Sequence, residues 1–430
     1  MTASFPLPHS IVVVGLGYVG LPLAVALARH FPVIGYDIDQ GRVAELQRGE
    51  DRTREVESAT LRASTLQLSA DAATIKGKAL YIVTVPTPVD DQNEPDLRPV
   101  RSASKSVGAA MAKGAVVVFE STVYPGVTEE ICGPILAQAS GLQQGVDFFL
   151  GYSPERINPG DKVHTVDKIA KIVAGENAAV AAMLAEVYGR VTSGGIHLAP
   201  TIKTAEAAKV IENAQRDINI AFMNEIAMIF GKLGISTHDV LEAAGTKWNF
   251  LKFQPGLVGG HCIGVDPYYL AHRAQALGHD PRIILAGRAI NDGMSRFVAE
   301  QVHAGMGGPG SAPGRVLVLG LTFKEDVPDL RNSKVADLVR ALEGLGHRVA
   351  VHDPLADPNE AQHEYGIMLT PRLEGLAGFD AVLGAVPHEV YRSLSPSQLA
   401  ALVKPDGLVA DLKGMWRGLE LPAGLKRWVL

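Results

Sequence analysis

Hydrophobic residues occur along this chain in short continuous runs, each followed by glycine, proline or small polar residues. In the N-terminal part, four such runs have the length of a strand: "IVVV" (11–14), "PVIGYDID" (32–39), "ALYIVTVPTP" (79–88) and "GAVVVFESTVYPG" (114–126). Near-continuous apolar strands are typical of a parallel sheet that is covered by helices on both faces. The pattern therefore predicts a doubly wound α/β domain.

The stretch from 11 to 28 is uncharged and apolar over a length that a membrane helix would need. It opens with four β-branched residues and then contains glycines at GxGxxG spacing. No basic segment precedes it and no cleavage-site pattern follows it. We therefore interpret it as a strand, a turn and a helix.

The same order of runs returns in the C-terminal part: "RVLVLGLTFKED" (315–326), "HRVAVHDP" (347–354), "FDAVLGAVPHE" (379–389) and "GLVADLKG" (407–414). This order predicts a second doubly wound domain, although its first turn lacks GxGxxG and is not expected to bind a second dinucleotide in the same way. Residues 202–230 contain neither glycine nor proline, which predicts a long helix that begins after Pro200 and ends at Gly231. Apolar residues on more than one face indicate that this helix is buried at a domain junction or a subunit interface. The glycine- and proline-rich stretch 303–314 is interpreted as a linker.

Three glycines follow the first apolar run at the spacing of a dinucleotide-binding turn. Gly15, Gly17 and Gly20 would permit a tight turn, close approach of the backbone to a pyrophosphate, and packing of the helix on the strand. The apolar part of the second run ends at Asp37, where a carboxylate can bind the ribose hydroxyls of NAD and repel the 2′-phosphate of NADP. The sequence therefore predicts NAD as the cofactor. The residues expected to line its site are Gly15, Gly17, Tyr18, Val19, Gly20, Asp37, Arg42, Thr84, Thr87, Ser121 and Thr122, although hydroxyls in such loops more often cap helices.

Composition narrows the classes of function. The 430 residues, 47% hydrophobic and 20% charged, describe a soluble chain with more than one core. The net charge of -6 and the lack of a lysine or arginine run give no footprint for nucleic acid or an anionic membrane. Cys132 and Cys262 are the only cysteines, which excludes a disulfide framework and fits a reducing cytoplasm, and no His/Cys cluster has metal-ligand spacing. We expect a cytoplasmic protein whose partners are small molecules and a second copy of itself.

Two pairs of polar residues are candidates for binding anions. Lys324 and Arg331 lie in the first loop of the C-terminal repeat, where they could hold a phosphate or pyrophosphate or could be solvated surface cations. Lys209 and Asn213 are four residues apart on the predicted long helix and therefore share a face. They could converge on a developing negative charge, but the residues alone favour an ordinary exposed pair.

Seven motifs in order carry a resemblance to a known family: "GLGYVGLPLA", "VPTP", "ESTVYPG", "GYSPER", "KVIENAQRDINIAFMNE", "GGHCIGVDPYYL" and "GLTFKEDVPDLRNS". The chain resembles the nucleotide-sugar 6-dehydrogenases, the UDP-glucose and UDP-N-acetylhexosamine dehydrogenases, along essentially its whole length. The resemblance implies two Rossmann-like domains joined by a long central helix that dimerises. It also implies NAD bound to the first domain and a UDP-sugar held between the central and C-terminal parts. The expected domains are an NAD-binding domain at 1–200, a central helical dimerisation domain at 201–302 and a UDP-sugar-binding domain at 303–430.

The resemblance assigns the chemistry to particular residues. Cys262 is implied as the nucleophile of a four-electron oxidation that converts the 6-hydroxymethyl group of the sugar to a carboxylate with two NAD molecules. A thiol suits this task because thiolate addition retains the aldehyde as a thiohemiacetal, and oxidation then gives a thioester that water hydrolyses. A free thiol is only about 3% ionised at pH 7, from its reference pKa near 8.5. A neighbouring cation such as Lys209 or His261 could raise the thiolate fraction.

Other roles follow from the same resemblance. Lys209 and Asn213 would stabilise the oxyanion of the alkoxide and thiohemiacetal stages. Asp266 would act with Lys209 and a water in the first deprotonation, Glu155 would be the base for thioester hydrolysis, and Thr122 would position that carboxylate or a water. The residues expected to bind the substrate are Glu155, Arg156, Lys209, Asn213, Gly259 and Lys324, and Arg331 is placed with the cofactor.

One departure from the family pattern bears on the sugar. UDP-glucose dehydrogenases carry a second glutamate four residues after the first, whereas "PERINPGD" has Pro159 at that position. The loss of bulk and charge, together with "TKWNFL" and "GGHCIGVDPYYL", resembles the enzymes of bacterial polysaccharide synthesis that oxidise UDP-N-acetylgalactosamine or UDP-N-acetylglucosamine. UDP-N-acetylmannosamine is the next expectation and UDP-glucose the third.

Two other classes of protein remain open at this point. An NAD-binding sensor of nucleotide sugars would keep the glycines and Asp37 but would need neither Cys262 nor Glu155. A two-electron dehydrogenase of the hydroxyacid type would share the domain plan, reduce one NAD per substrate and tolerate loss of the thiol.

Overall fold

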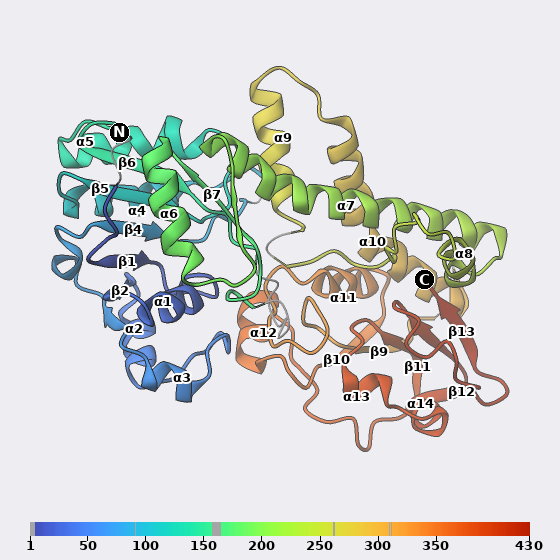
Figure 1. The fold of residues 1–430 in the computed structure, drawn as a ribbon. Coiled ribbons are helices and arrows are strands. Elements are labelled where there is room, and N and C mark those ends of the chain that lie inside the picture. Colours follow the sequence, from blue (N-terminus) through green and yellow to red (C-terminus); the bar gives the residue numbers. More distant parts are fainter. Residues whose placement is uncertain (1–4, 91, 157–164, 261–262, 309, 311) are drawn as a thin grey trace. The chain divides into compact units, whose positions relative to one another are not determined.

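The computed structural model of the chain describes residues 5–90, 92–156, 165–260, 263–308, 310 and 312–430 (Figure 1). Contacts divide the chain into two compact units, Met1–Glu212 with Tyr268–Asp280, and Asn213–Pro267 with Pro281–Leu430. Each unit is built around one twisted, mainly parallel sheet, so the predicted α/β class with two Rossmann-like domains is confirmed. The three domain boundaries expected from the sequence stay a prediction.

The sheet of the first unit has eight strands in the order β3-β2-β1-β4-β5-β6-β7-β8. All neighbouring strands are parallel except β6 and β7. The strands are β1 (Ile11–Val14), β2 (Val33–Tyr36), β3 (Gln67–Ser69), β4 (Leu80–Val83), β5 (Ala115–Phe119), β6 (Phe148–Tyr152), β7 (Lys171–Gly175) and β8 (Ile196–Leu198). The four runs predicted as strands are β1, β2, β4 and β5, and every residue of β1, β4 and β5 is buried, as expected for strands covered on both faces.

Helices complete the first unit: α1 (Gly20–Ala28), α2 (Gln40–Gln47), α3 (Ser58–Ala63), η1 (Ala72–Ile75), α4 (Arg98–Ala110), η2 (Thr128–Cys132), α5 (Gly133–Ser140) and α6 (Ala178–Gly189). The sequence of α1 is apolar throughout, and eight of its nine residues are buried. The uncharged stretch at 11–28 is therefore the strand, turn and helix that its sequence predicted. Among the described residues, no helix combines the length and hydropathy that crossing a bilayer requires.

The long helix α7 (Ile202–Leu233) begins where the sequence predicted but ends three residues later than the predicted end at Phe230. The prediction that Gly231 ends it is wrong. A helix tolerates glycine in its interior, whereas termination needs a residue that readily adopts a left-handed conformation. Gly234 is that residue, with φ of 70°.

The remaining helices before the second sheet are α8 (Thr237–Ala244), α9 (Asp266–Ala276) and α10 (Arg282–Met306). Helix α10 continues into the stretch 303–314 that was predicted to be a linker, so residues 303–306 are helical. Its last turns bury Val298, Ala299 and Val302 in the core of the second unit. Packing therefore extends the helix beyond the point that glycine and proline content indicates.

The sheet of the second unit has five parallel strands in the order β10-β9-β11-β12-β13. They are β9 (Arg315–Leu319), β10 (Arg348–His352), β11 (Phe379–Gly384), β12 (Val403–Asp411) and β13 (Lys426–Val429). The helices that follow them are α11 (Lys334–Gly344), α12 (Pro358–Tyr365), α13 (Glu389–Arg392) and α14 (Pro396–Leu402). The predicted repeat of the N-terminal pattern is thus a second Rossmann-like sheet.

The first turns of the two sheets share a geometry but differ in openness. Gly15 after β1 and Gly320 after β9 have φ of 95° and 98°. Each turn is bonded to an aspartate after the next strand, Asp37 in the first unit and Asp353 in the second. Asp353 is fully enclosed, because one carboxylate oxygen accepts a hydrogen bond from His388 and from two backbone N–H groups of the turn. Asp37 is only half-buried and can reach a ligand.

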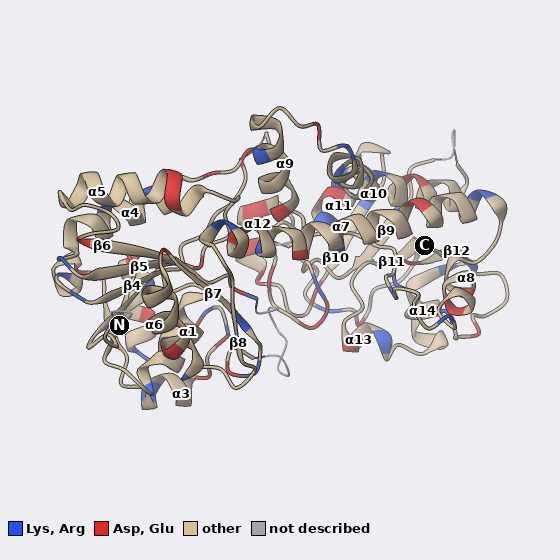
Figure 2. Cartoon of the chain, turned by 45° about the horizontal axis from the view of Figure 1, so that its top comes forward, with Lys and Arg blue, Asp and Glu red and all other residues tan. Residues whose placement is uncertain are grey.

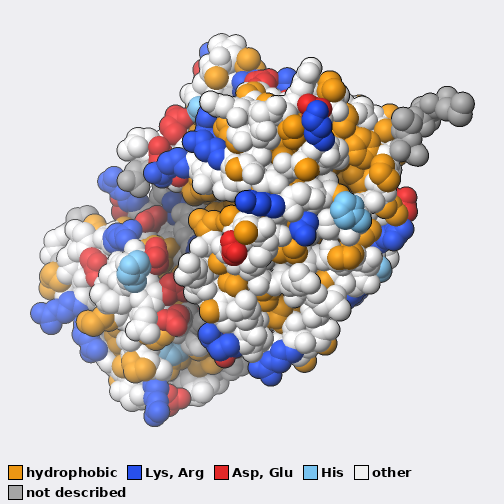
Figure 3. Space-filling model, turned by 90° about the vertical axis from the view of Figure 1, so that its left-hand side faces the viewer, with side chains coloured by type: hydrophobic (Ala, Val, Ile, Leu, Met, Phe, Trp, Pro, Cys, Tyr) orange, Lys and Arg blue, Asp and Glu red, His pale blue; other side chains and the backbone are white. Residues whose placement is uncertain are grey.

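Charged side chains are mixed in sign over both units. Lys and Arg alternate with Asp and Glu along the ribbon, in line with the net charge of -6 (Figure 2). On the face drawn in space-filling form, charged and hydrophobic side chains are likewise interspersed (Figure 3).

Candidate active site

Each glycine of the first turn meets a different steric demand. Gly15 has a positive φ of 95°, which an L-residue rarely adopts. A Cβ on Gly20 would lie 1.9 Å from the carbonyl oxygen of Gly15, so only glycine permits the helix to start so close to the strand. A Cβ on Gly17 would meet no atom within 4 Å, so the backbone there is open to a ligand. The turn therefore fits the pyrophosphate of a dinucleotide, with the open Gly17 three residues before α1 begins.

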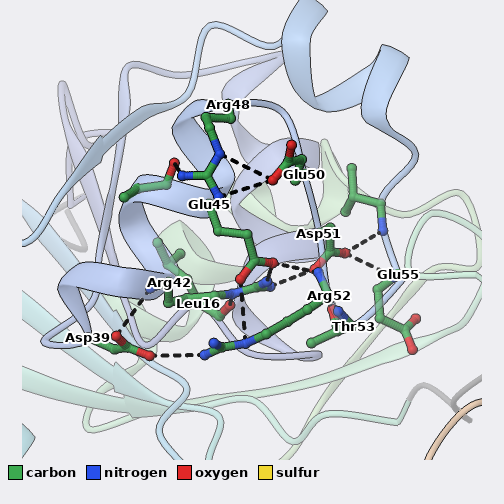
Figure 4. Close-up of polar contacts among 12 residues, drawn as sticks. Leu16, Asp39, Arg42, Glu45, Arg48, Glu50, Asp51, Arg52, Thr53 and Glu55 are labelled. Atoms are coloured by element: carbon green, nitrogen blue, oxygen red, sulfur yellow. Dashed lines mark hydrogen bonds and ion pairs between the residues drawn. The ribbon is translucent and has the colours of Figure 1, made fainter. Parts of the chain in front are cut away.

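The peptide groups of Leu16 hold this turn in place. The Leu16 N–H donates to Asp37 Oδ2 at 2.7 Å, and the Leu16 carbonyl accepts from Arg42 Nε at 2.9 Å (Figure 4). Asp37 also accepts from the Asp39 N–H at 2.9 Å. Asp37 thus has a structural task in addition to its predicted contact with ribose.

Arg42 is enclosed on its own side of the turn. Its guanidinium bonds Glu45 and Asp51, each at 2.7 Å, and the side chain is only 3% exposed. Burial alone would raise the pKa of Asp51, but hydrogen bonds from Thr53 and the neighbouring backbone, together with Arg42, hold it below its usual value. In Figure 4 the carboxylates of Glu45 and Asp51 point toward the Arg42 guanidinium. Arg42 therefore supports the turn, and the direct contact with NAD expected from the sequence stays a prediction.

The remaining cofactor candidates lie around the same strand ends. The hydroxyl of Thr84 donates to the carbonyl of Gly15 at 2.8 Å, and that of Ser121 donates to the carbonyl of Val85 at 2.6 Å. These hydroxyls tie neighbouring loops together at the carboxyl edge of the sheet. Three further candidates are half-buried there: Tyr18, Val19 and Thr87.

Replacement of Asp37 gives a direct test of cofactor choice. In Asp37→Ala we expect the preference for NAD over NADP to narrow by roughly tenfold, equal to about 1.4 kcal/mol, because a carboxylate no longer repels the 2′-phosphate. Asp37→Asn is the matched control, since it removes the charge but keeps an oxygen that can accept from Leu16. Kd values for both cofactors, measured by fluorescence titration, decide the point. An unchanged preference in both variants would show that Asp37 does not meet the ribose.

Thr122 and Glu155 leave the sheet side by side. Strands β5 and β6 are parallel with Phe119 opposite Tyr152, and each candidate follows three residues after its strand. Thr122 is half-buried, and Glu155 is only 6% exposed. The Arg156 N–H donates to Glu155 Oε1 at 2.6 Å.

The loops after β5 and β6 are both anchored to the first half of α7. The buried carboxylate of Glu206 accepts from the Gly126 N–H at 2.6 Å and the Thr128 N–H at 2.9 Å. Burial raises the pKa of Glu206 to about 7, although the hydrogen bonds from Gly126 and Thr128 favour the ionised form. On the other loop, the Arg156 guanidinium pairs with Glu212 at 2.8 Å and donates to the carbonyl of Ala170, the residue before β7. The guanidinium is therefore engaged within the protein.

Lys209 lies on α7 between these two anchors, three residues from each of Glu206 and Glu212. It is 7% exposed, and Asn213 on the same face is 6% exposed. The reading of the two residues as an ordinary exposed pair is therefore wrong. The periodicity of the sequence does not predict the burial of Lys209 and Asn213, because α7 has apolar residues on several faces and the pattern does not identify which face is buried.

In the second unit, Asn213 contacts another predicted catalytic residue. Its Nδ2 donates to Asp266 Oδ2 at 2.5 Å, and Asp266 is 2% exposed. Asp266 is the first residue of α9, where a carboxylate is stabilised by the helix dipole. The structure thus joins an amide and a carboxylate that are 53 residues apart.

The segment before Cys262 is held at two points within the second unit. The side-chain amide of Asn224 bonds both the N–H and the carbonyl of Gly256, at 2.8 Å and 3.0 Å. Asn332 donates to the carbonyl of Gly260 at 3.0 Å, and its own carbonyl lies 2.6 Å from where a Cβ on Gly259 would be. Gly259 is therefore a site of close backbone packing, in addition to its predicted role in substrate binding. No role was predicted for Asn224 or Asn332 from the sequence, although both lie within motifs that carry the family resemblance.

A polar pocket adjoins the same segment. It is lined by Leu257, Gly259, Phe323, Lys324, Glu325, Ser333, Lys334, Val335, Ala385, Val386, Pro387 and Lys413. Lys324 was predicted to bind substrate, whereas Lys334 and Lys413 were not identified from the sequence. Three lysines and the Phe323 ring therefore lie along the wall of one pocket. Arg331 pairs with Asp329 through two bonds of 2.6 Å and 2.9 Å, and its predicted contact with the cofactor stays a prediction.

Cys262, His261 and Pro159 lie outside the described residues. The other cysteine, Cys132, is fully buried, and burial raises the pKa of its thiol to about 12. Cys132 is therefore an inert core residue.

Comparison with known proteins agrees with this arrangement. Three models of the UDP-glucose/GDP-mannose dehydrogenase family match the chain: the NAD binding domain at 9–192, the central domain at 203–293 and the UDP binding domain at 317–418. A UDP-N-acetyl-D-glucosamine 6-dehydrogenase of Pseudomonas aeruginosa is 51% identical over 94% of this chain and 96% of its own length. One of Salmonella typhi is 47% identical, with 94% and 95% covered. The solved structure of a UDP-D-ManNAc dehydrogenase from Pyrococcus horikoshii superposes with a TM-score of 0.87 at 28% identity, covering 98% of each chain.

Proposed function

Since the chain belongs to the UDP-glucose/GDP-mannose dehydrogenase family, we propose that it oxidises the 6-hydroxymethyl group of a UDP-N-acetylhexosamine to a carboxylate. It is an NAD-dependent dehydrogenase, and UDP-sugars are the class of substrate that its family's third domain binds. The observation that carries the choice of sugar is the 47% and 51% identity to enzymes named for UDP-N-acetyl-D-glucosamine.

UDP-N-acetylglucosamine is therefore our first candidate, with UDP-N-acetylgalactosamine second. UDP-N-acetylmannosamine follows, supported by the solved relative at 28% identity, and UDP-glucose ranks last. The absence of a second glutamate at Pro159 also supports an N-acetylated sugar. An amide pocket discriminates strongly because its buried polar groups are left unsatisfied by a plain hydroxyl.

In the proposed reaction the chain's own residues move protons and hold charge. NAD, when bound, accepts the hydride at each of the two oxidation stages. Asp266, with Lys209 and a water, removes the hydroxyl proton of the sugar, and the aldehyde that results is attacked by the Cys262 thiolate. Lys209 and the amide of Asn213 stabilise the oxyanions, and the hydrogen bond from Asn213 to Asp266 keeps that carboxylate in place.

The second oxidation converts the thiohemiacetal on Cys262 to a thioester. Glu155 then takes a proton from a water, whose oxygen attacks the thioester carbon, and the C–S bond breaks to release the acid and the thiolate. Thr122, on the neighbouring loop, positions the water or the carboxylate. The pocket at Lys324 supplies cations for the diphosphate of the substrate.

A dimer formed through α7 is part of the proposal. Four large apolar residues of this helix are about half exposed or more: Ile211 (58%), Phe222 (53%), Ile229 (45%) and Leu233 (65%). Their spacings along α7 place them within one stripe of the helix. An exposed apolar stripe is stabilised when a second copy covers it. We also propose that the enzyme works in the cytoplasm. A reducing compartment keeps free the thiol on which this synthesis of polysaccharide precursors depends.

Stoichiometry tests the proposed reaction. With limiting UDP-N-acetylglucosamine and excess NAD, we expect two NADH per sugar, because the thioester route removes four electrons. Absorbance at the NADH band, with mass spectrometry of the product, gives the count. A plateau at one NADH would contradict the route and return the chain to the two-electron class. Parallel assays of the four UDP-sugars should rank the N-acetylated gluco and galacto sugars above UDP-glucose in kcat/KM.

A further inference from the structure

Three buried polar side chains of the first unit gather around the carboxylate of Glu155. Glu120 directly follows β5, Lys171 opens β7 and Tyr188 lies on α6. Exposure is 1% for Glu120, 1% for Lys171, 0% for Tyr188 and 6% for Glu155. Buried ionisable groups of this kind are costly unless each charge is matched, so their arrangement can be read as a charge balance.

Glu120 is fixed through both of its oxygens. Lys171 Nζ donates to Oε2 at 2.8 Å, and the Tyr188 hydroxyl donates to Oε1 at 2.5 Å. Burial raises the pKa of Glu120, and the Lys171 ammonium opposes that rise without cancelling it. For Lys171, burial lowers the pKa but the two glutamates outweigh it, so the net direction is upward and the lysine is charged.

Lys171 also faces Glu155. Its Nζ lies 3.7 Å from Glu155 Oε2 and 3.4 Å from the carbonyl oxygen of Pro154, to which it donates a hydrogen bond. The ammonium therefore holds the peptide immediately before Glu155 as well as its side chain. A lysine that served only to neutralise Glu120 would need neither contact.

We propose that Lys171 is a positioning residue for Glu155, holding this carboxylate oriented as the base of thioester hydrolysis. The inference rests on the proposed function, in which Glu155 has that role. Two carboxylates share one ammonium here, since Lys171 Nζ lies 2.8 Å from Glu120 Oε2 and 3.7 Å from Glu155 Oε2. The titratable groups that face Glu155 include Glu120 directly after β5, Lys171 on β7 and Tyr188 on α6.

Because Glu120 and Glu155 share the Lys171 ammonium, Lys171→Met and Glu120→Gln should shift the acid limb of the pH profile of kcat in opposite directions. In Lys171→Met, Glu155 loses its counter-ion beside a second carboxylate, so we expect the acid limb of the kcat profile to move up by on the order of one pH unit. In Glu120→Gln the whole ammonium charge acts on Glu155, so the same limb should move down. Lys171→Arg keeps the charge and should leave the limb within a few tenths of a unit of the unmodified enzyme.

Rapid-quench and stopped-flow measurements separate the stages. Lys171→Met should form the first two NADH at the normal rate and then stall, with steady turnover at neutral pH reduced about tenfold or more and thioester detectable by mass spectrometry. The measurements use the full-length enzyme, with NAD affinity and thermal unfolding confirming that each variant is folded. If Lys171→Met fails to fold, Glu120→Gln and Lys171→Arg still give the direction of the shift.

The outcomes separate the inference from the proposed function. Accumulation of thioester in Glu155→Gln supports the function of Glu155, and its absence there overturns that function and this inference together. With Glu155→Gln as expected, an acid limb that stays fixed in both Lys171→Met and Glu120→Gln would overturn the role of Lys171 alone. Infrared titration of isotope-labelled glutamate, with the Glu155 band identified by its loss in Glu155→Gln, should show the same opposite shifts in the free enzyme.

Discussion

Cys262→Ser should lose steady four-electron turnover by orders of magnitude while the protein keeps its fold. The two side chains are close in volume, but a serine hydroxyl is hardly ionised at neutral pH and is a far weaker nucleophile than a thiolate. The aldehyde stage should then be released or stall instead of passing to a thioester. Counting NADH per sugar in a single turnover, together with the steady rate, measures both effects.

The other cysteine provides the matched control. Cys132 is buried with an unreactive thiol, so Cys132→Ala should leave the count at two NADH per sugar. Alkylation of the intact enzyme should abolish turnover, and Cys262→Ser should no longer react with the reagent. Nearly full activity in Cys262→Ser would make Cys262 a structural residue and would remove the thioester route.

Gly20→Ala should disrupt the cofactor turn itself, even without NAD. The added Cβ would lie 1.9 Å from the Gly15 carbonyl oxygen and 2.3 Å from the Thr84 hydroxyl, so backbone must move. Overpacking of this kind costs about 1–3 kcal/mol, and we expect a lower unfolding temperature together with loss of NAD binding. Thermal unfolding of the free protein and NAD titration measure the two effects separately.

Gly17→Ala is the control that separates space in the protein from space for the ligand. Its Cβ would meet nothing within 4 Å, so the free variant should unfold at nearly the normal temperature. If a pyrophosphate lies against this glycine, NAD binding should still weaken, because the methyl group occupies the space of the ligand. Normal NAD affinity in Gly17→Ala would place the pyrophosphate elsewhere.

Short stretches of the sequence are enough to predict much of the fold. The four N-terminal and four C-terminal apolar runs are strands in both sheets, because a fully covered parallel strand needs only a short continuous run of apolar residues. The first turn could also be predicted from the sequence, because the positive φ at Gly15 and the close packing at Gly20 each require glycine. Strands β3, β6, β7, β8 and β13 lie outside these runs, because edge positions and the antiparallel pair β6 and β7 impose a weaker pattern.

The sequence predicted the ends of helices less accurately than it predicted the strands. Gly231 and the glycine-rich stretch at 303–314 look like terminators, yet α7 and α10 continue past or into them. A terminator acts only if the chain turns there, and the packing of a helix on its unit can outweigh the small cost of one interior glycine.

The working parts of the site depend on contacts between distant residues, which only the tertiary structure decides. Lys171 appears in the sequence as one lysine among several, but 51 residues separate it from the Glu120 that it bonds. Arg42 was expected to touch the cofactor, and only the structure shows that its guanidinium is paired with Glu45 and Asp51. Sequence supplied the chemical groups, since their types are fixed by the reaction. Their burial and partners are set by the path of the chain between them, and burial decides whether a charge is solvated, paired or able to tune its neighbour.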